Sequence, residues 1–310
     1  MRTAWLWIGQ VVLAAIVMWF VGGRLAGQWG ELARAPAALT FRIGPIALAM
    51  VTVLGAYALL IAAWNAVLRG WGANLAYSRA ARIWCLSNLG RYIPGKVWSV
   101  AGLAVLAQRE GATGWAAAGS AIAMQALALG TGAVAMAVTL PGAPNVTAAL
   151  IAGLVALAVV ASLTTAPVTG LVGRLSRGRF TLSPLPLSAV VLGGGATLAA
   201  WVLYGLALWM LSTGMLAAAP PPVPTAIGVF AAGYIVGLIA IFAPGGVGVR
   251  ELMLTALLGP VIGAGPAAAL SVGSRLMLTC TELAAALIAV AIGSGRAGRA
   301  SSVSTGGGDT

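Results

Sequence analysis

Long apolar stretches, separated by short polar or basic segments, run through most of the chain. An apolar stretch of about 20 residues predicts a helix that crosses a bilayer, because the hydrocarbon core is about 30 Å thick. A helix also satisfies its own backbone polar groups inside lipid. The predicted spans are residues 5–21, 43–67, 114–140, 146–168, 185–211 and 266–292. The pattern therefore predicts an all-α polytopic membrane protein.

Two further apolar stretches are each interrupted by a Pro-Gly pair. Proline removes a backbone donor and clashes with the preceding turn, and glycine frees the backbone. In the first stretch, the limb after the break has about 12 residues, or about 18 Å at the helical rise, which is too short to cross the core. Each stretch is therefore predicted to enter the membrane and return as a re-entrant helical hairpin. The limbs are residues 78–93 and 97–108 around Pro94-Gly95, and residues 225–242 and 248–258 around Pro244-Gly245.

The two halves of the chain resemble each other around these breaks. Half one covers about residues 43–140 and half two about residues 185–292, and Pro94 and Pro244 occupy equivalent positions in them. Both halves follow the order span, hairpin, span. This predicts an inverted repeat, and in transporters a pair of interrupted helices in matching positions indicates the binding site.

Composition excludes soluble and metal-dependent functions. Hydrophobic residues make up 61% of the 310 residues and charged residues only 7%, which differs strongly from a soluble domain. The chain has no histidine, and Cys85 and Cys280 lie alone in apolar stretches, so no metal or cofactor is expected. The carboxylates predicted near the membrane core are Glu110, Glu251 and Glu282. Without a histidine or an aspartate pair beside them, we do not expect an enzyme.

Basic residues outnumber acidic residues 17 to 5. In a membrane protein this surplus indicates orientation and contact with anionic lipid, not with nucleic acid. Both termini, residues 69–82, Arg109 and residues 174–179 are predicted to be cytoplasmic, so the two hairpins insert from opposite sides. The basic residues predicted outside are Arg24, Arg34 and Arg42. The predicted transmembrane domain is residues 1–293, and the Gly/Ser/Arg-rich tail, residues 294–310, is expected to be disordered.

Cations flank both Pro-Gly breaks. A helix that restarts after such a break presents unpaired N–H groups and the positive end of its dipole, so it readily binds phosphate or carboxylate. Arg91 and Lys96 flank the first break, and Arg250 with Glu251 flanks the second. The tip residues predicted to join the site are Pro94, Gly95, Pro244, Gly245 and Gly246. The alternative is that both tips are kinks, with their cations snorkelling or paired, and that Arg250 and Glu251 neutralise a local network.

The last span carries a polar stripe. Ser271, Arg275, Thr279 and Glu282 fall within about 80° of one another, at about 100° per residue. Ionisable residues in a span usually face a cavity or one another. One interpretation is a buried Arg275–Glu282 pair that locks this helix to its neighbours. The other is a stripe that lines a translocation cavity, where Glu251 or Glu282 couples lipid movement to protons or meets a cationic headgroup.

The phrases around the two breaks resemble those of a known family. Residues 88–98 (Asn-Leu-Gly-Arg-Tyr-Ile-Pro-Gly-Lys-Val-Trp) and 244–251 (Pro-Gly-Gly-Val-Gly-Val-Arg-Glu) are similar to the two characteristic stretches of the lysylphosphatidylglycerol synthase transmembrane-region family, also called flippase-like. The resemblance covers nearly the whole chain. In bifunctional members this module moves aminoacylated phospholipid across the bacterial inner membrane, and a separate soluble domain makes the lipid. Other members are linked to glycosylation pathways.

The resemblance implies a lipid translocator of the bacterial inner membrane. We expect no attached synthase, because the sequence ends soon after the last span. The implied cargo is an anionic or lipid-linked headgroup, such as an aminoacyl-phospholipid or a polyprenyl-phosphate sugar, so membrane lipid is the expected partner. The alternative is a non-transporting scaffold or regulator of a membrane glycosyltransferase or lipid synthase. The charged hairpins favour transport, because a scaffold gains little from broken helices with buried cations.

Overall fold

The part of the chain that the computed structural model describes is almost entirely helical. It comprises residues 39–92, 98–140, 142, 145–178, 183–217, 219–240, 246 and 248–304. Within these residues, extended pairing is limited to an isolated bridge between Leu39 and Leu216. The predicted span at residues 5–21 lies outside the described residues, as do the Pro-Gly pairs themselves. The predicted all-α class is confirmed.

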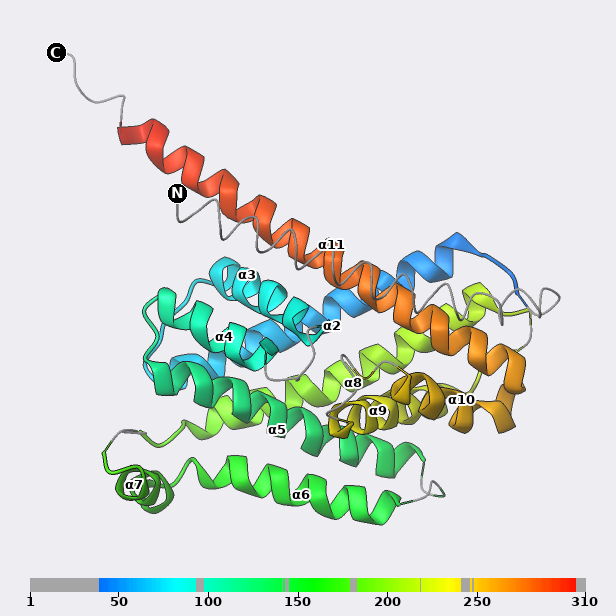
Figure 1. Cartoon of the computed structure of the whole chain (residues 1–310), viewed down its shortest axis with the longest axis horizontal. Helices are drawn as coiled ribbons and strands as arrows, with labels where there is room; N and C mark the ends of the chain where they lie inside the picture. Colours follow the sequence, from blue (N-terminus) through cyan, green and yellow to red (C-terminus); the bar gives the residue numbers. More distant parts are fainter. Residues whose placement is uncertain are drawn as a thin grey trace.

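Four of the described helices are long and apolar enough to cross a membrane. They are α2 (Ile43–Gly70), α5 (Gly114–Thr139), α8 (Leu187–Met215) and α11 (Ala264–Ser304). Each coincides with a predicted span, and α2 and α8 pack along each other through the middle of the molecule (Figure 1). The helices confirm the polytopic membrane fold that the apolar stretches predict.

The span expected at residues 146–168 is replaced by two helices. They are α6 (Val146–Ser162) and α7 (Ala166–Leu175), and their axes are bent by 84°. Between them, the hydroxyls of Thr164 and Thr165 each donate a 2.7 Å hydrogen bond to the carbonyl three residues back. Pro167 follows just after them, and its ring clashes with the carbonyl four residues back, so a straight helix does not continue through it. The stretch expected as a span at residues 146–168 is therefore bent, and it counts as a fifth span if the two helices are taken together.

Each Pro-Gly break separates two short helices that pack side by side. The first hairpin consists of α3 (Tyr77–Asn88), the 3₁₀ turn η2 (Leu89–Tyr92) and α4 (Trp98–Arg109). The second hairpin consists of α9 (Val223–Ile239) and α10 (Val249–Ile262). The predicted helix breaks are thus confirmed. The inverted repeat and the insertion of the two hairpins from opposite sides stay predictions.

Glycines allow the limbs of each hairpin to approach closely. A Cβ on Gly90 would lie 2.9 Å from the carbonyl carbon of Trp98 on the returning limb. In the second hairpin, a Cβ on Gly246 would lie 3.1 Å from the Cα of Gly237. Gly246 also adopts a φ of 70°, which L side chains rarely adopt. Gly246, one of the predicted site residues, therefore contributes to the close packing of the second hairpin.

Two helices, α5 and α11, each pack against both hairpins. α11 packs against α10 of the second hairpin and α3 of the first, and α5 packs against α4 and α9 (Figure 1). Each of these helices therefore contacts one limb of each hairpin. This arrangement brings together side chains from distant parts of the chain.

The last helix extends beyond the span expected to end at residue 292. α11 continues to Ser304, and residues 305–310 lie outside the described residues. No proline interrupts this segment, and adding residues to an existing helix avoids the unfavourable nucleation step. The expectation of a disordered tail at residues 294–310 stays a prediction.

Candidate functional site

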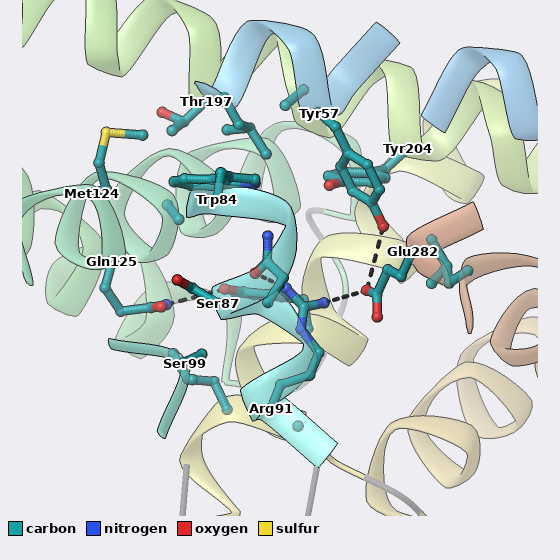
Figure 2. A pocket seen from close by; sticks show the side chains of 18 of the residues that line it. Tyr57, Trp84, Ser87, Arg91, Ser99, Met124, Gln125, Thr197, Tyr204 and Glu282 are labelled. Carbon is teal, nitrogen blue, oxygen red and sulfur yellow. Dashed lines mark hydrogen bonds and ion pairs between the residues drawn. The ribbon is translucent and has the colours of Figure 1, made fainter. Parts of the chain in front are cut away.

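A cavity of about 210 Å³ lies between the two hairpins. The first hairpin contributes Ser87, Asn88 and Arg91 to its lining, and the second contributes Gly237 and Arg250. The remaining walls come from α2, α5, α8 and α11, with the polar side chains grouped as Figure 2 shows. Four of the predicted site residues, Arg91, Arg250, Arg275 and Glu282, thus line one cavity.

Arg91 is held in an ion pair at the edge of this cavity. Its Nη1 donates to Glu282 Oε1 at 2.6 Å, and its Nη2 donates to Asn88 Oδ1 at 2.7 Å (Figure 2). The hydroxyl of Tyr57 donates to the same Glu282 oxygen at 3.3 Å. The side chain of Glu282 is only 4% exposed, so its charge requires these partners. Among the described residues the ion pair of Glu282 is with Arg91 and that of Arg275 is with Glu251, which does not fit the interpretation of an Arg275–Glu282 pair.

Glu251 orders the start of α10. Its Oε2 accepts a 2.6 Å hydrogen bond from the backbone N–H of Gly248, which caps the helix. Its Oε1 lies 3.6 Å from Nη1 of Arg275, and its backbone carbonyl accepts a 3.1 Å hydrogen bond from Ser271 Oγ. Ser271 and Glu251 therefore join α11 to the second hairpin, whereas Arg275 and Thr279 also line the cavity. Glu251 therefore forms an ion pair with Arg275 across the contact of α10 with α11.

Arg250 lines the cavity, and its guanidinium is buried beside it. The guanidinium carbon lies 4.6 Å from the centroid of the Phe230 ring, within the range of a cation–π contact. Its Nε and Nη2 are shielded from solvent and have no hydrogen-bond partner among the described residues. The side chain runs past Gly233 and Gly237, where added Cβ atoms would lie 3.3 Å and 3.5 Å from Arg250 carbons. The two glycines thus leave the space that Arg250 occupies.

Two further unpaired donors come from α3. Trp84 Nε1 and Ser87 Oγ are buried, line the cavity and lack a hydrogen-bond partner among the described residues. An indole N–H only donates, and a hydroxyl donates or accepts. Leaving such a group buried and unpaired costs about 1–3 kcal/mol. Together with Arg250, these groups give the cavity a set of donors suited to an oxyanion.

The sequence analysis missed Trp84 and Ser87 as site residues, although the spacing of polar residues before the first break could have indicated them. Trp84, Ser87, Asn88 and Arg91 follow a spacing of i, i+3, i+4 and i+7, which places them on one helical face. Trp84 and Ser87 are individually indistinguishable from packing residues in an apolar stretch. The polar face becomes informative only when it is counted together with Arg91.

Aromatic side chains form one wall of the cavity. Tyr204 and Phe230 stack with centroids 4.8 Å apart, and Trp201 meets Tyr234 edge to face at 5.0 Å. Gln125 Nε2 donates to the Tyr234 hydroxyl at 3.1 Å, joining α5 to α9. Tyr57, whose hydroxyl donates to Glu282, packs edge to face on Tyr204 at 6.3 Å, so this aromatic wall adjoins the charged pair of Arg91 and Glu282.

Several predicted site residues lie outside the described part of the chain. They are Pro94, Gly95, Lys96, Pro244 and Gly245. Their contribution to the site stays a prediction. Among the described residues, no group of three or more histidine, cysteine, aspartate or glutamate side chains is arranged to hold a metal ion.

The comparison with known proteins gives the same family that the sequences around the two Pro-Gly breaks resemble. A family model described as lysylphosphatidylglycerol synthase TM region matches residues 7–286, which include both hairpins and the whole lining of the cavity. No curated protein matches the chain. Because the family model spans most of the sequence, the chain belongs to the lysylphosphatidylglycerol synthase transmembrane-region family.

Proposed function

We propose that the protein translocates a lipid headgroup across the bacterial inner membrane through the cavity between the two hairpins. The acyl or prenyl chains of a lipid can remain in the hydrocarbon, so only the headgroup needs a polar path. Membership of the family and the set of membrane-spanning helices support this function. The candidate cargoes are an aminoacyl-phospholipid and a polyprenyl-phosphate sugar.

The observation that carries the proposal is a charged cavity at the junction of two interrupted helix pairs. Arg91, Arg250, Arg275 and Glu282 line it. Ionisable residues at membrane depth are expensive and usually serve an ion or substrate path. Packing alone gives no reason for them, because replacing buried ion pairs by apolar residues is often neutral or stabilising. A headgroup path explains why the chain maintains these charges beside broken helices.

Transbilayer movement of headgroup-labelled lipids in proteoliposomes tests the proposal. Purified protein should move at least one lipid class faster than protein-free liposomes, as measured by chemical quenching of the label in the outer leaflet. Arg250→Gln should slow that movement about tenfold or more, since it removes a charged donor pair. Arg82→Gln, at an exposed position of α3, is the matched control and should leave the rate unchanged.

The same experiment separates transport from the scaffold alternative. Rates equal to those of protein-free liposomes for phospholipids and polyprenyl-phosphate sugars would contradict translocation. Copurification of a membrane glycosyltransferase or lipid synthase under those conditions would favour a scaffold or regulator.

A further inference from the structure

We propose that the cavity selects a phosphate ester whose other substituents are uncharged, with Arg250, Trp84 and Ser87 as its ligands. This inference rests on the proposed function and deepens it, because it chooses between headgroup chemistries. It assigns ligand roles to Trp84 and Ser87, and it excludes a headgroup that carries an ammonium group.

The unpaired edge of Arg250 has the geometry that binds an oxyanion. Nε and Nη2 are the two neighbouring donors on one side of the guanidinium, and both lack a hydrogen-bond partner among the described residues. Two parallel N–H groups of this kind hold two oxygens of a phosphate in a bidentate contact. The cation–π contact with Phe230 at 4.6 Å leaves the in-plane donors available for such a ligand.

The other two donors belong to the first hairpin. Trp84 Nε1 and Ser87 Oγ lie on α3, whereas Arg250 lies on α10, and all three residues line the same cavity. Ser87 is 5% exposed, so its unpaired hydroxyl is directed to the interior of the protein. A phosphate has enough acceptor oxygens to satisfy the donors of both hairpins at once. A ligand of this chemistry would therefore complete the hydrogen bonding of both halves.

The carboxylates near the cavity are already engaged by protein groups. Glu282, the sole carboxylate among the described lining residues, accepts from Arg91 at 2.6 Å and from Tyr57 at 3.3 Å. Glu251 accepts from the backbone of Gly248 at 2.6 Å and pairs with Arg275 at 3.6 Å. An ammonium group has three donors and no acceptor, so it would have to share these carboxylate oxygens with the protein donors that already contact them.

A cationic headgroup would also meet the charge of Arg250. Two like charges in a partly desolvated cavity repel each other far more strongly than in water. A lysyl ester of a phospholipid would place its ammonium groups in this field. The charge pattern therefore favours an anionic phosphate ester, such as that of phosphatidylglycerol or a polyprenyl-phosphate sugar, over an aminoacylated phospholipid.

A competition experiment with defined lipids tests this selectivity. The full chain in detergent micelles is mixed with equimolar phosphatidylglycerol and lysyl-phosphatidylglycerol, and bound lipid is measured by native mass spectrometry. We expect a preference for phosphatidylglycerol of about tenfold or more. Equal binding, or a preference for the lysyl ester, would overturn the inference.

Variants at the three ligands locate the selective site. Arg250→Gln should reduce phosphatidylglycerol binding about tenfold or more and abolish the preference, and Trp84→Phe and Ser87→Ala should each reduce binding about threefold to tenfold. The exposed control Arg82→Gln should match the wild type. If Arg250→Gln elutes as an aggregate in size-exclusion chromatography, Arg250→Lys replaces it. Lysine keeps the charge without the planar fork, so it should lower the preference. An unchanged preference in the folded Arg250 variant would overturn the assignment.

A second arm distinguishes a lipid headgroup from a soluble phosphate ester. sn-Glycerol 3-phosphate should displace phosphatidylglycerol only at much higher concentration than a short-chain phosphatidylglycerol does. If the soluble ester binds and the lipid fails to displace it, the ligand is a soluble phosphate ester and not a lipid headgroup. The proposed function is judged separately: selective binding without transbilayer movement would contradict translocation, and movement without this headgroup preference would contradict the inference.

Discussion

Arg91 and Glu282 join two elements that are 191 residues apart in the sequence. The guanidinium of Arg91, at the tip of the first hairpin, donates to the carboxylate of Glu282 on α11 at 2.6 Å. The side chain of Arg91 is 38% exposed and that of Glu282 is 4% exposed. The pair therefore anchors a partly accessible hairpin tip to a buried position of the opposite half.

Removing the carboxylate should destabilise the protein. Glu282→Gln deprives Arg91 of its ionised partner, and we expect a loss of about 1–3 kcal/mol, the contribution of a hydrogen bond to a charged group. The decrease is measured as a lower melting temperature in detergent micelles. The pair of Arg79 and Glu110, at 3.2 Å with Arg79 63% exposed, is the control. Breaking it by Glu110→Gln should cost about 0–1 kcal/mol. Equal losses at both sites would contradict the role of burial.

Two substitutions at Glu251 should separate its cap from its ion pair. Glutamine can still accept from the N–H of Gly248, as in a capping box, but it does not pair with the charge of Arg275. Glu251→Ala removes both interactions and should lower stability by about 1 kcal/mol more than Glu251→Gln. The comparison uses the same thermal unfolding measurement. Identical melting temperatures for the two variants would show that the cap does not contribute.

Gly246 should not tolerate a side chain. Gly246→Ala places a Cβ 3.1 Å from the Cα of Gly237 and strains a φ of 70°, so we expect a loss of about 1–3 kcal/mol. Gly195→Ala is the matched control, because a Cβ at that position of α8 would have no atom within 4 Å. The substitution also removes a glycine from the interior of a helix. It should be neutral or stabilising by about 0.5–1 kcal/mol. A stable Gly246→Ala variant would contradict the close packing of the second hairpin.

Labelling of single cysteines tests the predicted insertion of the hairpins from opposite sides. In a background without Cys85 and Cys280, Asn74→Cys precedes α3 and Ala219→Cys precedes α9, and both positions are exposed. A membrane-impermeant thiol reagent should reach Asn74→Cys from the cytoplasmic side and Ala219→Cys from the outer side. Arg177→Cys should label with Asn74→Cys, because its basic loop is predicted to be cytoplasmic. Labelling of Asn74→Cys and Ala219→Cys from one side would refute the opposite topology.

Helices were predictable from the sequence where the apolar stretches are long and uninterrupted. The ends of α5 lie within one residue of the predicted span at residues 114–140, because charge and turn residues bound that stretch on both sides. The bend between α6 and α7 was not predictable in the same way. Hydropathy continues across Thr164 and Thr165, and the break lies just before Pro167, whose ring clashes with the carbonyl four residues back.

The sequence predicted which charged residues belong to the candidate site. It did not predict which residue each of them contacts. The sequence placed Arg91, Arg250, Arg275 and Glu282 in apolar surroundings, where charge requires either a partner or a ligand. Their pairing follows from contacts of α11 with α3 and α10, and these contacts have no sequence periodicity.

The sequence by itself determined the helical membrane class, the positions of the two helix breaks and the family. These properties depend on local hydropathy, on the backbone chemistry of proline and glycine, and on short phrases of residues. Only the tertiary structure decided that Glu282 compensates Arg91, that Glu251 engages Arg275, and that Arg250 presents unpaired donors. The reason is physical: a charge is satisfied by whatever group lies within hydrogen-bond distance in space, and separation along the chain does not set that distance.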